Sequence, residues 1–275
     1  MAHNLFQSQI LVQKAVAAGA KVALFLPEAS DYVPASPTES LFLARPLQEN
    51  DFVLGLQKEA RLARIPINVG VHEPAPSGQK VRNVLIWIDE NGKITQKYQK
   101  IHLFDVEIPG GPVLKESRKA ANGSIWIFCS RGVEKGMEII PPFDTPIGRL
   151  GLSICFDLRF PELSLALRRQ GCHVITYPSA FTVPTGRAHW EILLRARAIE
   201  TQSYVVAAAQ CGKHNSKRTS YGHSMIVNPW GEVIARLGAE SDQPEIAVAN
   251  IDLNILEKVR SEMPLLRRTD IYPEL

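Results

Sequence analysis

The sequence lacks the features of several large classes of protein. No apolar run approaches the ~20 residues of a membrane span, and the first residues lack the basic-then-apolar order of a signal peptide. The 31 Lys and Arg nearly balance the 28 Asp and Glu, and the two signs are interspersed. Charge therefore gives no argument for a nucleic-acid or membrane partner. We expect a soluble protein of the cytoplasm.

Cysteine and histidine patterns are also missing. The four cysteines, Cys129, Cys155, Cys172 and Cys211, form no CxxC pair. Their scatter argues against a zinc ribbon and a disulfide framework, and it fits a reducing compartment. The seven His residues form no HExxH or comparable ligand spacing. We therefore expect no metal site.

No Gly/Ser-rich or charged linker divides the 275 residues, and 45% of them are hydrophobic, which is enough for a full core. We expect one domain over residues 1–275.

Apolar patterns predict helices over 4–18, 47–64, 161–171, 188–200 and 253–261, with loops over 31–50 and 213–219. They predict strands over 21–26, 67–71, 150–154, 172–177, 204–209 and 245–251, and hairpins over 81–100 and 221–235. This alternation of strands and helices indicates an α/β fold.

Cys155 follows a short apolar run, 150–154, and precedes a helical pattern that Pro161 opens. The end of a strand in an α/β fold is where a side chain is presented to a ligand while the scaffold holds it still. A cysteine taken at random is more often a buried, inert thiol. The surrounding residues therefore have to decide between the two interpretations.

Glu28 and Lys100 also follow strand-like runs. Glu28 comes directly after the apolar run 22–26 and Pro27, although an isolated Glu is more often a loop carboxylate or a helix cap. Lys100 ends a hairpin whose turn contains Asn91 and Gly92. A Lys is ordinarily a solvated surface charge, as we expect for Lys97, but the apolar residues after Lys100 indicate a partly desolvated ammonium.

Three segments together resemble the nitrilase superfamily of carbon–nitrogen hydrolases. They are Cys-Phe-Asp-Leu-Arg-Phe-Pro-Glu from Cys155, Phe-Leu-Pro-Glu-Ala around Glu28, and Tyr-x-Lys-x-His-Leu-Phe-Asp around Lys100. The resemblance implies a four-layer α-β-β-α sandwich, catalysis by Glu28, Lys100 and Cys155, and a supporting role for Glu116. It implies no cofactor. For substrate binding we expect Phe156, Arg159, Ser179 and Phe181, with Arg159 and the 210–219 loop contacting substrate carboxylates.

The implied reaction is hydrolysis of an amide. Cys155 attacks the carbonyl carbon, and Glu28 takes the thiol proton and passes it to the departing ammonia. Lys100 and the backbone N–H of Phe156 bind the oxyanion, and water activated by Glu28 hydrolyses the thioester. A papain-like alternative would use a His as the base. We expect His102, His189 and His223 to be structural, because Glu28 already fills that role.

The sequence departs from the superfamily at two places. Relatives begin with a strand before the first helix, whereas this chain starts almost inside that helix, so we expect either a sandwich without its N-terminal strand or an incomplete N-terminus. A mitochondrial form fits the second alternative. The second departure is an atypical insert at 117–136, with the apolar core Ile-Trp-Ile-Phe, which we expect to be non-native or dispensable.

Within the superfamily, the resemblance is strongest to the deaminated glutathione amidases. The segments that carry it include 111–117, 177–181, 188–191, 195–202, 207–212 and 221–225. It implies an amidase that acts on the terminal amide of deaminated glutathione in metabolite repair, as a homodimer or larger homo-oligomer. Two alternatives stay open: an ω-amidase acting on free 2-oxoglutaramate, and a non-catalytic binding protein that keeps the fold.

Overall fold

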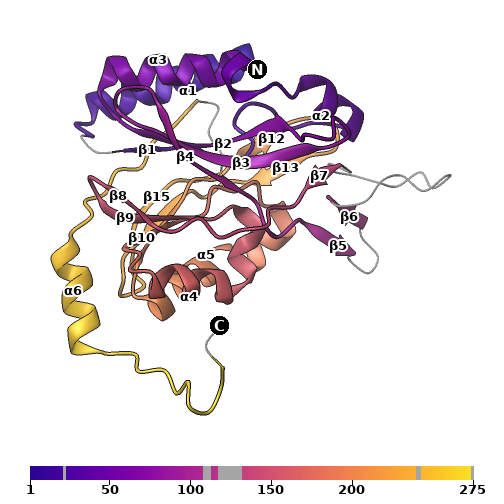
Figure 1. Cartoon of the computed structure of the whole chain (residues 1–275). Helices are drawn as coiled ribbons and strands as arrows, with labels where there is room; N and C mark the ends of the chain where they lie inside the picture. Colours follow the sequence, from indigo (N-terminus) through magenta and orange to yellow (C-terminus); the bar gives the residue numbers. More distant parts are fainter. Residues whose placement is uncertain (21–22, 108–112, 117–131, 240–242, 274–275) are drawn as a thin grey trace.

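Runs of apolar residues form the strands of two β-sheets, which lie face to face between layers of helices. The computed structural model describes residues 1–20, 23–107, 113–116, 132–239 and 243–273. Figure 1 shows the four layers: α1 and α3, then one sheet, then the second sheet, then α4 and α5. The expected α-β-β-α sandwich is confirmed.

The first sheet has the strand order β1-β2-β3-β4, and β7 pairs with β3. Its strands are β1 (Leu24–Phe25), β2 (Ile67–Pro74), β3 (Val81–Ile88), β4 (Ile94–Gln99) and β7 (Val133–Glu134). Side chains of β3 alternate between two cores. Val84, Ile86 and Ile88 face α1 (Ala2–Ala17) and α3 (Asp51–Ala63), whereas Leu85 and Trp87 face the second sheet.

The second sheet has the strand order β15-β14-β11-β10-β9-β8. Its strands are β8 (Phe143–Thr145), β9 (Gly148–Leu152), β10 (Val174–Thr176), β11 (Tyr204–Ala207), β14 (Met225–Val227) and β15 (Val233–Arg236). Strands β9, β10 and β11 are parallel. The helices α4 (Pro161–Arg169) and α5 (Val183–Thr201) cover the outer face.

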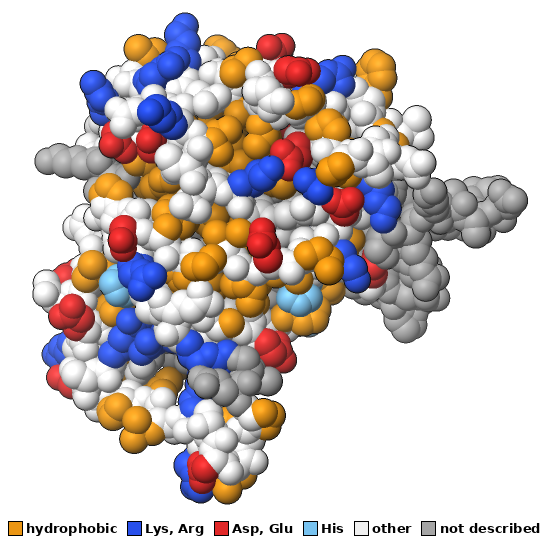
Figure 2. Space-filling view, in the orientation of Figure 1, with side chains coloured by type: hydrophobic (Ala, Val, Ile, Leu, Met, Phe, Trp, Pro, Cys, Tyr) orange, Lys and Arg blue, Asp and Glu red, His pale blue; other side chains and the backbone are white. Residues whose placement is uncertain are grey.

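Shorter elements complete the described chain. They are α2 (Pro37–Leu43), the 3₁₀ helices η1 (Leu47–Glu49) and η2 (Cys155–Arg159), the hairpins β5 (Asp105–Glu107) with β6 (Val113–Lys115) and β12 (Cys211–Lys213) with β13 (Thr219–Tyr221), and α6 (Leu253–Glu262). Within the described residues, no helix is long and apolar enough to cross a bilayer. Figure 2 shows basic and acidic side chains interspersed over one face.

Local signals predicted most elements, and four predictions were wrong. The helix expected over 47–64 starts only at Asp51, because the side chain of Asn50 caps it by accepting from the N–H of Phe52 at 3.0 Å. The loop 31–50 contains α2, whose first turn is capped by Ser36. The loop 213–219 is the turn of the β12–β13 hairpin. Residues 245–251 form no strand.

The missing strand at 245–251 has a physical reason at the edge of the first sheet. A strand exists only where a neighbour supplies a hydrogen-bonding ladder, and within the described chain β1 pairs with β2 alone. Residues 243–251 and β1 instead line a groove of about 1380 Å³ together with α1. This open edge beside β1 agrees with the expectation of a sandwich without its N-terminal strand. Residues 117–131, most of the expected insert, lie outside the described residues.

Candidate active site

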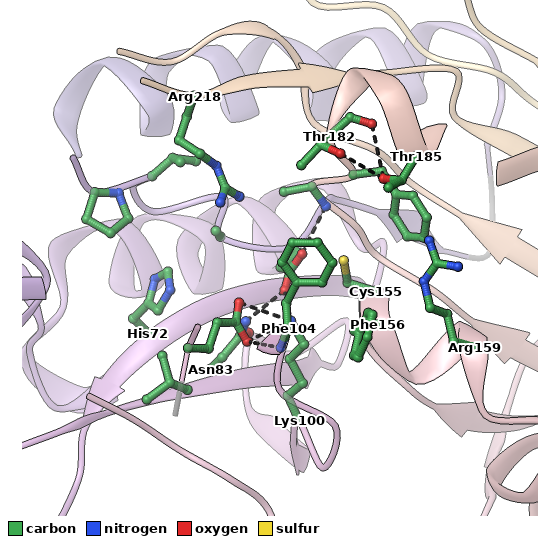
Figure 3. A pocket seen from close by; sticks show the side chains of 18 residues that line it. His72, Asn83, Lys100, Phe104, Cys155, Phe156, Arg159, Thr182, Thr185 and Arg218 are labelled. Carbon is green, nitrogen blue, oxygen red and sulfur yellow. Dashed lines mark hydrogen bonds and ion pairs between the residues drawn. The ribbon is translucent and has the colours of Figure 1, made fainter. Parts of the chain in front are cut away.

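The ends of three strands bring an acid, an amine and a thiol into one cavity. Glu28 follows β1, Lys100 follows β4, and Cys155 follows β9 at the start of η2. All three line the same cavity, and Figure 3 shows Lys100 and Cys155 facing it from different elements. Each is almost fully buried; Lys100 is only 1% exposed. Burial of a charged ammonium requires partners of opposite charge.

Two carboxylates supply those partners. The Nζ atom of Lys100 lies 2.9 Å from Oε1 of Glu28 and 3.3 Å from Oε2 of Glu116. Glu28 also accepts from Nδ2 of Asn83 at 2.8 Å and from the backbone N–H of Ala180 at 2.9 Å. Glu116 accepts from the N–H of Phe104 at 2.9 Å. These bonds fix both carboxylates around the ammonium.

The backbone of Cys155 is held in an unusual conformation. Its φ is +48°, in the left-handed region that residues with a side chain rarely adopt. The N–H of Cys155 donates to the carbonyl of Pro178 at 3.0 Å, which anchors this turn to the end of β10. The thiol of Cys155 lines the same cavity as the Glu28 carboxylate. The fold thus maintains a strained turn at the position where the thiol meets the carboxylate.

Burial and charge set the protonation states. Burial alone would raise the pKa of Glu28, but the Lys100 charge and hydrogen bonds from Lys100, Cys155 and Asn83 hold it below its usual value. Burial alone would lower the pKa of Lys100, but Glu116 and Glu28 raise it well above its usual value. Burial, followed by the charge of Glu28, raises the pKa of Cys155. The resting site therefore holds carboxylate, ammonium and neutral thiol.

A third buried carboxylate connects the lysine segment to the cysteine turn. Asp157 is fully buried, and its Oδ2 accepts from the Tyr98 hydroxyl at 2.7 Å and from the N–H of Ile154 at 2.9 Å. Its Oδ1 accepts from the backbone N–H of His102 at 3.0 Å and lies 2.8 Å from Nδ1 of that ring. Tyr98 and His102 flank Lys100 in the sequence. His102 therefore has a structural partner, as expected.

The structure places three of the four expected substrate-binding residues at the cavity. Phe156, Arg159 and Phe181 line it, and the Arg159 guanidinium lies 5.7 Å from each of the two ring centroids. Ser179 is fully buried away from the cavity wall, and its hydroxyl donates to the Tyr177 carbonyl at 2.9 Å. Ser179 instead holds the loop backbone in place, because its N–H donates to the carbonyl of Ala208 at 2.9 Å.

The other two histidines also have structural contacts. Nδ1 of His189 lies 3.2 Å from the Arg159 guanidinium. The carbonyl of His223 accepts from the indole N–H of Trp190 at 2.8 Å.

Sequence reasoning missed two other lining residues, His72 and Asn83, whereas Arg218 belongs to the 210–219 loop that was expected to contact substrate carboxylates. His72 and Asn83 are direct partners in the β2–β3 ladder, so the pairing of the two strands brings them together. Each is a polar residue inside an otherwise apolar strand, and this interruption was the available signal. Among the described residues, no group of three or more His, Cys, Asp or Glu side chains is placed to hold a metal ion.

An α-β-β-α sandwich with an acid, an amine and a thiol in one buried cavity defines the nitrilase class of protein. The chain belongs to the carbon–nitrogen hydrolase family, whose model matches residues 2–261. It is 46% identical over 273 residues to "Probable hydrolase nit2" of Schizosaccharomyces pombe, a match that covers 99% of this chain and 94% of that protein. It is 45% identical over 275 residues to human "Deaminated glutathione amidase", covering 96% and 77%.

Solved structures agree on the fold. The Caenorhabditis elegans NitFhit protein superposes with a TM-score of 0.86 at 41% identity, over 99% of this chain and 63% of that one. Saccharomyces cerevisiae Nit3, described as a member of branch 10 of the nitrilase superfamily, superposes with a TM-score of 0.80 at 28% identity, over 97% and 90%.

Proposed function

We propose that the protein is an amidase that works through a thioester on Cys155. The observation that carries this proposal is the position of Lys100, whose Nζ lies 2.9 Å from Glu28 and 3.3 Å from Glu116 in the cavity that Cys155 lines. A nucleophile, a proton acceptor and a fixed positive charge are the groups that acyl transfer requires.

Proton transfer accompanies the attack. Cys155 is a neutral thiol at rest because burial raises its pKa, and Glu28 is ionised. A free thiolate beside the Glu28 carboxylate would be repelled, so the proton moves to Glu28 as sulfur bonds to the carbonyl carbon. Proton transfer by a positioned side chain contributes about 10²–10⁴-fold to the rate.

Lys100 stabilises the charge that develops on the carbonyl oxygen. Its raised pKa keeps the ammonium protonated throughout, and the N–H of Phe156, directly after the nucleophile, supplies a second donor. Glu28 then gives its proton to the amine as the carbon–nitrogen bond breaks, leaving the thioester. In the second half, Glu28 takes a proton from water and the hydroxide attacks the thioester. Glu28 returns the proton to the sulfur as the carbon–sulfur bond breaks, which regenerates the thiol and releases the carboxylic acid product.

We assign the substrate as deaminated glutathione. The support is the name carried by the human relative and by the mouse relative, which is 45% identical over 272 residues. Deaminated glutathione has no primary amide, so hydrolysis at its 2-oxoglutaramate-like end releases cysteinylglycine and 2-oxoglutarate. Ammonia, the leaving group expected from the sequence, is instead the product from free 2-oxoglutaramate.

The test compares the two amides in one assay. Formation of 2-oxoglutarate is followed with deaminated glutathione and with 2-oxoglutaramate, and kcat/KM is determined for each. We expect a higher value for deaminated glutathione. A preference for 2-oxoglutaramate would make the protein an ω-amidase. No turnover of either amide, together with a Cys155 thiol inert toward iodoacetamide, would support a non-catalytic binding protein.

We further propose that the chain assembles as a homodimer. Ile192 and Ile199 lie two turns apart on α5 and are 69% and 43% exposed, and Trp230 is 57% exposed. The turn beside Trp230 contacts this helix, since the Gly231 carbonyl accepts from Nε of Arg195 at 2.8 Å. An exposed apolar patch of this kind is typical of a protein–protein interface.

We propose a cytoplasmic location, a single domain over 1–275 and a dispensable insert at 117–136. The location is supported by the free thiols of Cys155, Cys172 and Cys211, which persist in a reducing compartment. The single domain is supported by the match of one family to residues 2–261. Deleting 117–131 tests the insert, because loss of folding or turnover would show that it is needed.

A further inference from the structure

A buried His–Asp pair lies in the cavity wall beside the proposed catalytic groups. Nδ1 of His72 lies 3.0 Å from Oδ1 of Asp31, and the backbone N–H of His72 donates to Oδ2 at 2.8 Å. Asp31 is fully buried and His72 is 5% exposed. The ring of Tyr32 stacks on the imidazole with the centroids 4.5 Å apart. The orientation of the His72 ring is therefore fixed from two sides.

These contacts leave the other ring nitrogen directed away from Asp31. Within the described chain, Nε2 of His72 has no hydrogen-bond partner, although His72 lines the cavity. Burial alone would lower the pKa of His72, but Asp31, with smaller contributions from Glu28 and Glu116, raises it. The surroundings thus favour the protonated ring, and its Nε2 is available to a ligand.

Arg218 brings a second cation to the same side of the nucleophile. It comes from the loop between β12 and β13 and lines the cavity. Figure 3 shows Arg218 and His72 on one side of Cys155 and Arg159 on the other. The loop is attached to the first sheet's side of the molecule, since Nδ2 of Asn215 donates to the Val33 carbonyl at 3.3 Å.

The charged groups around the cavity indicate which class of ligand His72 and Arg218 suit. The cavity wall holds two carboxylates, Glu28 and Glu116, beside Lys100, and the buried Asp31 pairs with the lining residue His72. A substrate carboxylate entering this region would be repelled unless further positive charge faced it. A guanidinium binds carboxylates through paired hydrogen bonds, so Arg218 is a lining group of the kind that a carboxylate requires.

We propose that His72 and Arg218 form a subsite for a carboxylate on the acyl portion of the amide substrate. The inference rests on the proposed amidase function and adds the residues that hold the carboxylate of the acyl group. The acyl group must remain bound while the amine departs, so it belongs beside the more buried wall that contains His72. Arg159, which is half-buried, lies on the other side of Cys155, and we assign that side to the departing amine.

Two amides of equal chain length test the subsite. Glutaramate and pentanamide share five carbons and a primary amide, and they differ only in a terminal carboxylate instead of a methyl group. Charge-assisted hydrogen bonds contribute about 1.5–3 kcal/mol, or roughly 10- to 100-fold. We expect Arg218→Gln to lower the ratio of kcat/KM for glutaramate over pentanamide by about this factor. Arg218→Lys should keep part of the ratio. Lys213→Gln, which removes an exposed charge from the same hairpin, is the matched control.

Glutarate binding gives a measurement that needs no turnover. By calorimetry, Arg218→Gln and His72→Gln should each weaken glutarate binding by about 10- to 100-fold relative to the unmodified protein. Glutarate affinity within threefold of the unmodified value in Arg218→Gln, or an unchanged ratio of the two amides, would overturn the subsite while leaving the amidase proposal intact. If neither amide is hydrolysed, glutarate binding alone decides the subsite, and 2-oxoglutarate formation from deaminated glutathione decides the proposed function.

Discussion

The hydroxyl of Tyr98 donates to Oδ2 of Asp157 at 2.7 Å, although Tyr98 lies in β4 of the first sheet and Asp157 lies in η2, which follows β9 of the second. Tyr98 precedes Lys100 by two residues, and Asp157 follows Cys155 by two. The same carboxylate also binds His102 on the far side of Lys100. This single buried acid therefore sets the separation between the lysine segment and the cysteine turn.

Tyr98→Phe should destabilise the fold and slow turnover. The change removes a buried hydrogen bond to a charged group, which contributes about 1.5–3 kcal/mol to the free energy of unfolding. We expect kcat to fall while KM changes little, because Lys100 and Cys155 lose their fixed separation. Urea unfolding and steady-state kinetics measure the two effects. Tyr272→Phe, at an exposed position, is the control and should stay within about 0.5 kcal/mol. A Tyr98→Phe variant as stable as the control would contradict this role for Asp157.

Glu116→Gln should reduce kcat less than Lys100→Met does. Glu116 lies 3.3 Å from the ammonium and holds it in place, whereas Lys100 itself faces the developing oxyanion. Removing an oxyanion donor costs about 10²–10³-fold in kcat, so we expect about that loss for Lys100→Met and about tenfold for Glu116→Gln. Kinetics on folded variants, checked by circular dichroism, provide the comparison. An equal loss in both variants would give Glu116 a direct part in the chemistry.

The rate at which iodoacetamide alkylates Cys155 should keep rising with pH above the value at which the alkylation rate of an ordinary thiol levels off. A free thiol has a pKa of about 8.5, and burial with the Glu28 charge raises that of Cys155. Mass-spectrometric peptide mapping at pH 7 to 10 follows the reaction and separates it from that of the exposed Cys211. A Cys155 rate that levels off near pH 8.5 would show that the neutral-thiol resting state is wrong.

Stability should also fall at both ends of the pH range. The lowered pKa of Glu28 gives stabilisation that is present above its unfolded value near 4.5 and is lost as pH falls through the folded value. The raised pKa of Cys155 gives stabilisation that is present below 9.0 and is lost as pH rises toward the folded value. Cys155→Ala should therefore flatten the decline above pH 9, as measured by urea unfolding. A decline of the same slope in both proteins would argue against a raised Cys155 pKa.

Ile192→Asp should convert a dimer to a monomer. The charge would be placed in the apolar patch on α5, and burying an unpaired carboxylate in an interface is strongly unfavourable. Analytical ultracentrifugation of the unmodified protein and the variant gives the masses. Leu62→Asp, at another helical position that is 69% exposed, is the control. An unmodified protein that is already monomeric would rule out the dimer.

Sequence reasoning succeeded where the signal was local. Glu28, Lys100 and Cys155 each follow a strand-like run, and the structure brings all three to one cavity. The hairpin around Gly92 was predicted from its turn residues, and β3 and β4 confirm it.

Sequence reasoning failed where the pairing of strands that are separate in the sequence determines which residues meet. His72 and Asn83 meet only because β2 and β3 pair in one register. Residues 245–251 have the composition of a strand but no adjacent ladder in the described chain.

The most direct test of the account is the mass of the protein during turnover. Acid quenching in the presence of deaminated glutathione preserves a thioester, and peptide mapping then identifies the modified residue. We predict a 2-oxoglutaryl group on Cys155, and no such adduct in Cys155→Ala. Turnover in which no acyl group forms, or in which it forms on another residue, would contradict the proposed mechanism.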